Sequence, residues 1–368
     1  MKHSSPLARR QFLARAGGAA FLPLGIPSIL TASRTTPPIV IGTGDYRYEV
    51  LHNWPQLPPQ FTWQTTQGAA IDRDGCLYVI HNGVREQANH PAIFAFDPTG
   101  KHIRSFGQEF QGGGHGIEVR QEDDEQFLYV CCYKHLKCLA KLTLHGDVVW
   151  KRQAPMQSGV YAPGEDSAPT SQRGRNHFEP TNFAFLPDGD LLVADGYGSF
   201  FIHRYTKDGA WKNHFGGPHP KGDGGPGPGT FNLPHGICFD ARPGREPSVV
   251  ICDRVNNRLQ FVSQDGRHLE TLDGFDLPAN VEVQGDLLLV PELNGRVTLL
   301  DGKNTVIARL GASANAGGSD RIKPDRADPS TWVPGEFVHP HDACFDAQGN
   351  IIVVEWVTPG RVTRLRRV

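Results

Sequence analysis

Three histidines occupy equivalent places in this sequence, and their placement is the strongest sign of chemistry in the chain. His115, His235 and His341 each open a short apolar segment, and they are separated by about two lengths of a repeat that runs through the chain. Neutral imidazole nitrogens are common ligands of zinc and other transition metals. Three such nitrogens on one face of an ion leave positions open for water or substrate. The spacing therefore predicts a three-histidine metal site.

A packing role is the alternative for each of these residues. The chain contains 16 histidines, and a single histidine at the start of a strand is more often a packing or turn residue than a ligand. Three in the same register, on alternating repeats, are harder to explain in that way. Zinc fits the site best because neutral imidazoles suit it and no cysteine thiolate lies in register with the histidines. Iron, copper and manganese remain open.

The repeat that places these histidines occurs six times. Each unit has a short apolar strand, a turn of the Asp-Gly kind and a second strand rich in Val, Ile and Leu, and further strands follow around a second turn. The first strands open at Gln67, His115, Thr181, His235, Ala279 and His341. Each unit is therefore expected to be a four-stranded antiparallel sheet.

Such a sheet cannot bury both faces alone, so the units must pack side by side. Six sheets arranged radially protect their edges and close a ring. We therefore predict an all-β, six-bladed β-propeller that forms a single domain over residues 34–368. The last unit has three strands, and we expect residues 46–50 to supply the fourth and close the ring. A β-sandwich is the alternative fold, but it does not account for six repeats in register.

The propeller also predicts what lies beside the histidines. First strands of alternate blades line the channel one third of a turn apart, so the three imidazoles converge on the axis. The end of each second strand lies beside the start of the first. Tyr197 and Arg254 follow second strands in the third and fourth units. Tyr197 is a candidate acid or base, and Arg254 a candidate binder of a substrate carboxylate. The alternatives are an aromatic loop plug and an ion pair with a blade aspartate.

Three insertions rich in Gly and Pro interrupt the repeat, at about 155–176, 216–231 and 311–337. All three precede a first strand. Long loops at one end of a rigid scaffold are frequent sites of function.

The N-terminus is interpreted as a twin-arginine export signal over residues 1–33. Arg9 and Arg10 precede a weakly apolar run that is interrupted by Gly and Pro, and small residues follow at 31–33. A chance arginine pair before a short signal anchor is the alternative. The signal predicts a periplasmic or secreted protein whose mature chain has no membrane span.

Charge and cysteine content bear on the possible partners and on disulfide bonds. The net charge is −2, and no basic block follows the N-terminus, which argues against a nucleic-acid partner. No CxxC pattern occurs, and cysteines within apolar runs are interpreted as buried thiols. Whether Cys132 and Cys138, which flank a short turn, form a disulfide stays open. The seven cysteines are Cys76, Cys131, Cys132, Cys138, Cys238, Cys252 and Cys344.

Several short motifs resemble those of a known family. They are NHFEPTN at 176–182, DGY at 195–197, LPHG at 233–236, DR at 253–254, NRLQ at 257–260 and PHD at 340–342. These motifs are similar to those of the peptidyl-α-hydroxyglycine α-amidating lyases (peptidylamidoglycolate lyases) within the NHL-repeat propellers. The similarity extends from about residue 66 to the end of the chain.

This resemblance implies a reaction and a site. The family cleaves the N–C bond of a C-terminal α-hydroxyglycine and releases a peptide amide and glyoxylate. Its zinc-binding histidines map onto the three described above, its catalytic tyrosine onto Tyr197 and its substrate-facing arginine onto Arg254. A structural calcium in the family uses the carboxylate after the last histidine, which is Asp342 here.

Two positions depart from the family pattern. A second arginine of the family is replaced by Asn82, and Arg85 follows three residues later. His339 also stands at an altered position before the last histidine motif, and it is a candidate for a fourth nitrogen near the metal. The metal site carries over better than the lyase reaction does.

Two functions of different classes follow. One is a zinc-dependent carbon–nitrogen lyase or related enzyme that acts on a small carboxylated or amide-containing substrate. The other is a non-catalytic NHL-repeat propeller with a structural metal, which binds a protein or glycan. A lactonase is a third candidate, but lactonase sites rest on carboxylates and asparagines around calcium. An open coordination position near Tyr197 favours the enzyme, whereas a fourth protein ligand favours the binding protein.

Overall fold

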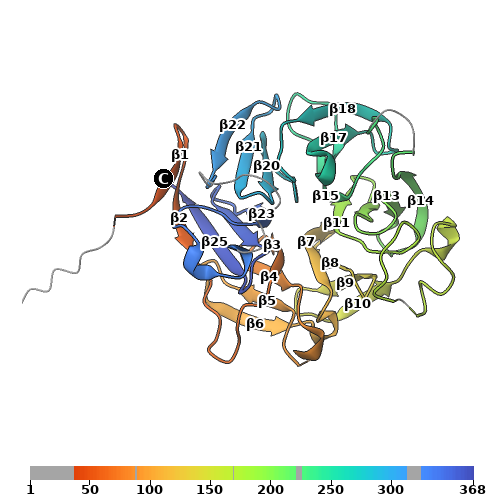
Figure 1. Cartoon of the computed structure of the whole chain (residues 1–368), viewed down its shortest axis with the longest axis horizontal. Helices are drawn as coiled ribbons and strands as arrows, with labels where there is room; N and C mark the ends of the chain where they lie inside the picture. Colours follow the sequence, from red (N-terminus) through yellow and green to blue (C-terminus); the bar gives the residue numbers. More distant parts are fainter. Residues whose placement is uncertain (1–36, 88, 169, 221–225, 313–324) are drawn as a thin grey trace, which may run out of the picture. The chain divides into compact units, whose positions relative to one another are not determined.

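The strands of the chain form six antiparallel sheets arranged radially around one axis, as a computed structural model shows (Figure 1). It describes residues 37–368 except 88, 169, 221–225 and 313–324. The six-bladed β-propeller predicted from the repeats is therefore confirmed. The expected export signal at 1–33 lies outside the described residues and stays a prediction.

The first three blades follow the order of the chain. Blade 1 contains β3 (Thr66–Ile71), β4 (Leu77–His81), β5 (Ile93–Phe96) and β6 (His102–Phe106). Blade 2 contains β7 (Gly114–Glu122), β8 (Glu125–Cys132), β9 (Cys138–Thr143) and β10 (Val148–Arg152). Blade 3 contains β11 (Asn182–Phe185), β12 (Leu191–Ala194), β13 (Phe201–Tyr205) and β14 (Trp211–Gly216).

The remaining blades continue the order, and the last one also takes in the N-terminal strands. Blade 4 contains β15 (Pro234–Asp240), β16 (Ser248–Asp253), β17 (Arg258–Val262) and β18 (His268–Asp273). Blade 5 contains β19 (Glu282–Gln284), β20 (Leu287–Glu292), β21 (Arg296–Leu300) and β22 (Val306–Leu310). Blade 6 contains β23 (Pro340–Phe345), β24 (Ile351–Glu355), β25 (Arg361–Arg367), β2 (Tyr46–His52) and β1 (Val40–Thr43).

Short 3-10 helices interrupt the loops. They are η1 (Arg85–Gln87), η2 (Gln108–Phe110), η3 (Met156–Ser158), η4 (Arg254–Asn256) and η6 (Pro329–Thr331). Within the part of the chain that the structure describes, no helix combines the length and apolar character needed to cross a bilayer.

The ring is closed by strands from both termini. Strand β2 pairs antiparallel with β25, with Tyr48 opposite Arg367 and Val50 opposite Leu365. The predicted closure by residues 46–50 is therefore confirmed. The structure adds β1 outside β2 as a fifth strand. This strand is mostly exposed, and its sequence has no alternation of polar and apolar residues that could have predicted it.

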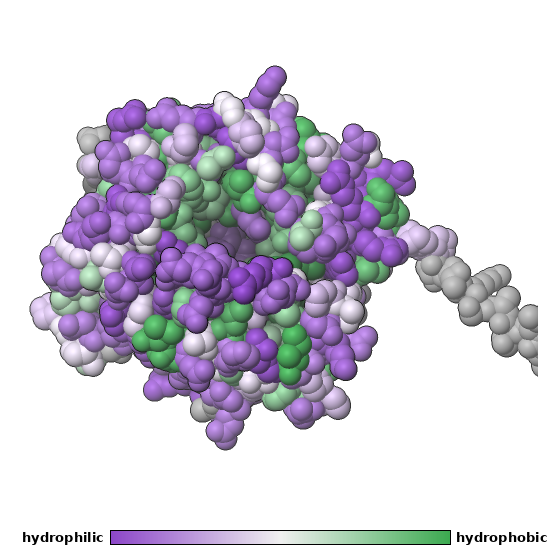
Figure 2. Space-filling model, turned by 180° about the vertical axis from the view of Figure 1, so that it is seen from behind, coloured by the Kyte–Doolittle hydropathy of each residue, from purple (hydrophilic) through white to green (hydrophobic). Residues whose placement is uncertain are grey.

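The hydrophobic core lies between the blades. Successive side chains of a strand point to opposite faces. In β4, Tyr78 and Ile80 pack with Ile117 of blade 2, whereas Leu77 and Val79 pack with residues of blade 6. Clusters of this kind fill the contact between each pair of neighbouring blades. The axis itself is not filled in this way, and Figure 2 shows a hollow at the centre of the ring.

The cysteines carry no disulfide. All seven are free, although Cys132 and Cys138 lie directly opposite each other on β8 and β9. Cys252 and Cys344 are buried, as expected, whereas Cys76 and Cys238 are only half-buried.

Closure of the ring by β2 leads to a stability prediction. Tyr48 is 1% exposed and packs in the cluster between blades 5 and 6, so Tyr48→Ala is expected to lower the free energy of unfolding by about 3 kcal/mol. Arg47→Ala is the matched control because this exposed neighbour points away from the core, and a change below about 0.5 kcal/mol is expected. Chemical denaturation monitored by circular dichroism measures both. Equal losses in the two variants would contradict closure by this strand.

Candidate metal centre

The three histidines lie on the innermost strands of alternate blades. His115 is on β7, His235 on β15 and His341 on β23. In each of these strands the pairing with the next strand shifts register across the histidine. Such a β-bulge adds one residue to the strand and re-aims its side chain. The bulges therefore turn the imidazoles toward the axis of the ring.

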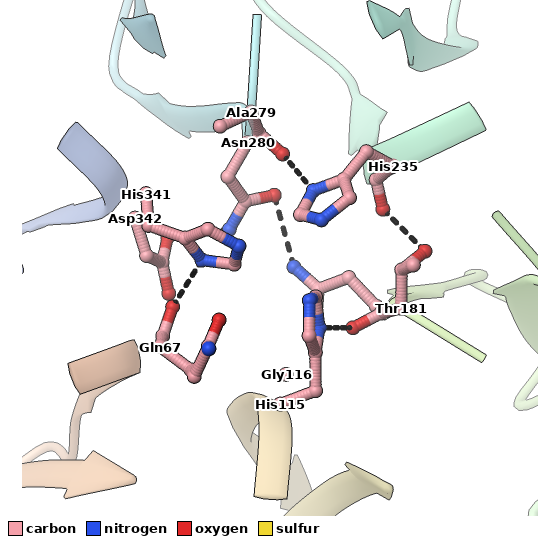
Figure 3. Close-up of a pocket in the computed structure, with 10 residues that line it drawn as sticks. Gln67, His115, Gly116, Thr181, His235, Ala279, Asn280, His341 and Asp342 are labelled. Atoms are coloured by element: carbon pink, nitrogen blue, oxygen red, sulfur yellow. Dashed lines mark hydrogen bonds between the residues drawn. The ribbon is translucent and has the colours of Figure 1, made fainter. Parts of the chain in front are cut away.

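The imidazoles converge there, as Figure 3 shows. Their candidate ligand nitrogens all lie within 4.8 Å of one another, and the ring centroids are 4.8 to 4.9 Å apart. The side chains are buried, with at most 4% of each residue exposed. Within the described part of the chain, no other group of three or more His, Cys, Asp or Glu side chains is close enough to share an ion.

The blades between the histidine blades hold the imidazoles in place. The Nδ1 atom of His115 lies 2.9 Å from the carbonyl oxygen of Thr181, that of His235 2.5 Å from Ala279 and that of His341 2.6 Å from Gln67. A carbonyl oxygen can only accept, so Nδ1 carries the proton and Nε2 keeps its lone pair. The six strand openings therefore alternate between imidazole and carbonyl around the axis.

The residues after the histidines allow this close approach. A Cβ atom on Gly116 would lie 2.3 Å from the Thr181 carbonyl oxygen, and one on Gly236 2.3 Å from the Cα atom of Asn280. Only glycine fits at these two positions. Asp342 stands at the third equivalent position, after His341.

Burial keeps the imidazoles neutral, which is the form that binds metals. Loss of hydration lowers the pKa of His115 to about 3, and the charge of Arg254 adds to this effect, whereas the bond to the Thr181 carbonyl opposes it. Burial likewise lowers the pKa values of His235 and His341 well below the ordinary range. The Nε2 atom of His115 is buried and has no hydrogen-bond partner in the described part of the chain. A metal ion on the axis could bind the lone pair of this nitrogen, so the three imidazoles fit a metal ion.

Polar groups line the channel in the next layer. Asn182 donates to Asn280 at 2.9 Å and to Glu118 at 3.1 Å, and Asn280 donates to Asp342. The Asp342 carboxylate also accepts from the amides of Ala69 and Ala343, at 2.9 and 2.8 Å. Burial raises its pKa to about 6. Asp342 therefore lines the same channel as the histidines, with protein donors at both of its oxygens.

Tyr197 and Arg254 lie at the mouth above the histidines. The Tyr197 hydroxyl is 3.0 Å from Nε2 of His235, and its oxygen accepts from Nη2 of Arg254 at 3.3 Å. Arg254 begins η4, directly after β16, and is 8% exposed. The alternative that Arg254 pairs with a blade aspartate is not what the structure shows, because Asp253 pairs with Arg258 at 2.7 Å. The structure brings both residues to the histidine site.

Sequence reasoning missed two residues of the same mouth, Tyr133 and Lys134. The Tyr133 ring stacks on that of Tyr197, with centroids 5.4 Å apart, and meets the ring of His115 at 5.0 Å. Its hydroxyl donates to Oδ1 of Asn82 at 2.8 Å, and Nζ of Lys134 donates to the same oxygen at 3.0 Å. Both residues follow β8, the second strand of blade 2. The rule that located Tyr197 and Arg254 would have found them if it had been applied to this unit.

The first insertion, 155–176, supplies another cation. Arg173 lies with its guanidinium carbon 5.4 Å from the centre of the Tyr197 ring, and its Nε is 3.5 Å from the carboxylate of Glu179. Glu179 is fully buried, and burial raises its pKa to about 7 against the lowering effect of Arg173. A buried ion pair between Lys137 and Glu165, 2.7 Å long, ties this insertion to blade 2. The insertion therefore forms part of the rim of the site.

His339, the candidate for a fourth nitrogen, is not part of the histidine cluster. Its Nδ1 atom lies 2.6 Å from the carbonyl oxygen of Leu293, and its ring contacts that of Trp356. His339 lies one residue before the start of β23 (Pro340–Phe345), the strand that carries His341. Arg85, the nearest arginine to Asn82 in the sequence, is exposed in η1. Burial lowers the pKa of His135, and the charge of Arg85 adds to this effect.

The fold and the site together define a six-bladed β-propeller whose channel carries a three-histidine cluster that could bind a metal. No family model matches the chain. The chain is 27% identical to NHL repeat-containing protein 3 of Homo sapiens, over 60% of its own length and 57% of that protein. It is also 27% identical to peptidyl-alpha-hydroxyglycine alpha-amidating lyase 1 of Drosophila melanogaster, over 73% of its own length and 48% of that protein.

These two similarities confirm the resemblance that the motifs indicated, although the chain spans only about half the length of each relative. Among solved structures, the chain matches a gluconolactonase from Xanthomonas campestris with a TM-score of 0.53 and 12% identity, over 87% of this chain and 89% of that one. At this identity the match concerns the fold alone.

The convergence of the imidazoles leads to a prediction about metal content. Replacing His115, His235 or His341 by alanine removes one of three ligands, so each variant is expected to hold well below one metal ion per chain. His268→Ala is the matched control, since this histidine lies at the outer edge of blade 4. Elemental analysis of the purified proteins measures the content. Full occupancy in all three variants would show that the imidazoles do not bind the ion.

Proposed function

We propose that this chain is a metal-dependent lyase. It would cleave the N–C bond of a carbinolamide that resembles α-hydroxyglycine, and release an amide and glyoxylate. The proposal rests above all on the position of the Tyr197 hydroxyl, 3.0 Å from Nε2 of His235 and 3.3 Å from Arg254. A proton carrier and a carboxylate binder thus meet on the open side of a three-nitrogen site. The similarity to a protein named as an amidating lyase supports the same reaction.

Zinc held by His115, His235 and His341 would supply Lewis acidity to the substrate hydroxyl. Arg254 binds the substrate carboxylate and so places the hydroxyl beside Tyr197. In the reaction, the hydroxyl oxygen loses its proton and forms a carbonyl with its carbon as the C–N bond breaks. The departing amide nitrogen gains one proton. Tyr197 is placed to give its phenol proton to the departing nitrogen and to gain the proton that the substrate oxygen loses, so that the enzyme ends the cycle unchanged.

The competing proposal is a non-catalytic NHL-repeat propeller with a structural metal, which binds a protein or a glycan. A fourth protein ligand would favour it, because structural zinc sites are closed by four ligands. His339 was the candidate, and it contacts the Leu293 carbonyl instead of joining the cluster. The enzyme is therefore the better proposal.

Three further points belong to the proposal. The protein would be exported by the twin-arginine route to the periplasm or beyond, on the basis of residues 1–33. Its partner would be a small carboxylated or amide-containing substrate, and not a nucleic acid. A structural calcium at Asp342 also belongs to the proposal, and it would have to share a carboxylate that accepts from two amides and Asn280. Calcium in the same elemental analysis, lost in Asp342→Asn, tests that site.

The role of Tyr197 can be tested with N-benzoyl-α-hydroxyglycine. The native protein is expected to release glyoxylate, and Tyr197→Phe to lower kcat by about a hundredfold or more, because a proton carrier is lost while the three metal ligands remain. Arg254→Gln should mainly raise KM. Tyr46→Phe, in the remote strand β2, is the control with unchanged rates. A native protein that holds its metal and yet releases no glyoxylate would contradict the lyase and favour the binding protein.

A further inference from the structure

The mouth of the site carries more positive charge than one substrate carboxylate requires. Four cationic side chains act on the groups around it: Lys134, Arg173, Arg254 and Arg326. Lys134 lies over the Tyr133 ring, and Arg173 and Arg254 lie over the Tyr197 ring, with guanidinium carbons 5.4 and 5.3 Å from its centre. Arg326 lies over the ring of Trp356. Arg254 alone donates to the Tyr197 hydroxyl. The other cations therefore need an explanation beyond the carboxylate next to the scissile bond.

These cations are held close together although they repel one another. Burial lowers the pKa of Lys134, and the charges of Arg173 and Arg326 lower it further, whereas Glu179 opposes them. Gathering like charges at a half-buried site costs folding stability. An anion bound between them would relieve that cost.

Lys134 and Arg173 are the two cations that remain available to a ligand. Lys134 lies over the Tyr133 ring, 4.9 Å from its centre, and uses one of its three N–H groups on Asn82. Arg173 has its Nε 3.5 Å from the carboxylate of Glu179, but 57% of its side chain is exposed and the two terminal nitrogens of its guanidinium can still bind a ligand. Arg326, in contrast, is committed to Trp356, since its Nε donates to the carbonyl oxygen at 2.7 Å and its guanidinium lies 3.4 Å from the ring centre.

The two groups also lie apart from the element that carries Arg254. Lys134 follows β8 of blade 2, and Arg173 lies in the insertion before blade 3, whereas Arg254 follows β16 of blade 4. The stacked rings of Tyr133 and Tyr197 lie among them. A substrate whose carboxylate binds Arg254 would therefore extend its amide side along the two phenols toward Lys134 and Arg173.

We infer that Lys134 and Arg173 form a second anion subsite, and that the preferred substrate carries a second carboxylate on the amide side of the scissile bond. The identity of the scissile bond rests on the proposed lyase function, but the subsite is a matter of binding alone. Asn82 has a role in this arrangement. It carries no charge itself, and its amide oxygen positions the ammonium group of Lys134.

Two unreactive probes test the subsite without turnover. Hippurate has one carboxylate, and 4-carboxyhippurate has a second one on the amide side. In calorimetric titrations of the metal-loaded, full-length protein, 4-carboxyhippurate is expected to bind about tenfold more tightly, the effect of one charge-assisted contact. This preference should shrink when NaCl is raised from about 50 mM to about 500 mM, because salt screens half-exposed charges.

The variants assign the preference to its residues. Lys134→Met/Arg173→Gln is expected to reduce it to within about twofold, whereas Lys134→Arg should keep most of it because the charge remains. Lys207→Met/Arg267→Gln removes the same two charges from the outer turns of blades 3 and 4 and should leave the preference unchanged. Metal content and thermal melting show whether each variant is folded. If the double variant does not fold, Lys134→Met alone, with a preference reduced to about half or less, carries the test.

The outcomes separate this inference from the proposed reaction. Equal affinity for the two probes in the native protein would overturn the subsite, and so would a preference that survives in the double variant. A preference that depends on Lys134 and Arg173, in a protein that releases no glyoxylate, would keep the subsite and overturn the lyase. Glyoxylate release by a protein that binds hippurate and 4-carboxyhippurate equally would keep the lyase and overturn the subsite.

Discussion

The site depends on the contact between each imidazole and the carbonyl group of the next blade. The imidazoles of His115, His235 and His341 donate to the carbonyl groups of Thr181, Ala279 and Gln67, respectively. Imidazole and carbonyl groups therefore alternate around the axis. Each contact fixes the tautomer of a histidine and also joins two blades at their innermost strands. A change in the number of blades, or in the register of one blade, would break the alternation. The closed ring is therefore a requirement of the site as well as of the fold.

Closure in turn depends on strands that are remote in the sequence. Blade 6 carries His341 on its first strand, and its outer strand β2 comes from the other end of the chain. Tyr48 and Val50 of that strand complete the cluster between blades 5 and 6. Hydrophobic packing between blades thus sets the positions of the innermost strands, and the bulges in those strands set the direction of the imidazoles. Within each histidine blade, the side chains between blades stabilise the ring, whereas the start of the innermost strand forms the site.

Much of this could be predicted from the sequence, because a repeat converts sequence spacing into positions in space. The three histidines, the closing strand, Tyr197 and Arg254 all follow from their place in the unit. The carbonyl contacts of Thr181 and Ala279 could not be predicted, since a backbone group leaves no mark in the side-chain pattern. Arg173 lies in an insertion without periodicity, so its approach to Tyr197 depends on how the loop packs. His339 is close to His341 in the sequence, but its side chain contacts the Leu293 carbonyl and does not join the histidine cluster. Closeness in the sequence therefore did not place it at the metal site.

The charges along the axis explain why an anionic ligand would approach the ion from one side. On one side of the histidines lie Asp342, Glu118 and Glu282, and burial raises the pKa of Glu282 to about 8 and that of Glu118 as well. On the other side lie the cations of the mouth, beside Tyr197. Because their pKa values are raised, these carboxyl groups carry little charge that would repel an anion, whereas the cations of the mouth attract anions to the side of Tyr197. Carboxylated molecules would therefore be drawn to the face where Tyr197 and Arg254 lie, and charge would orient them before any specific contact forms.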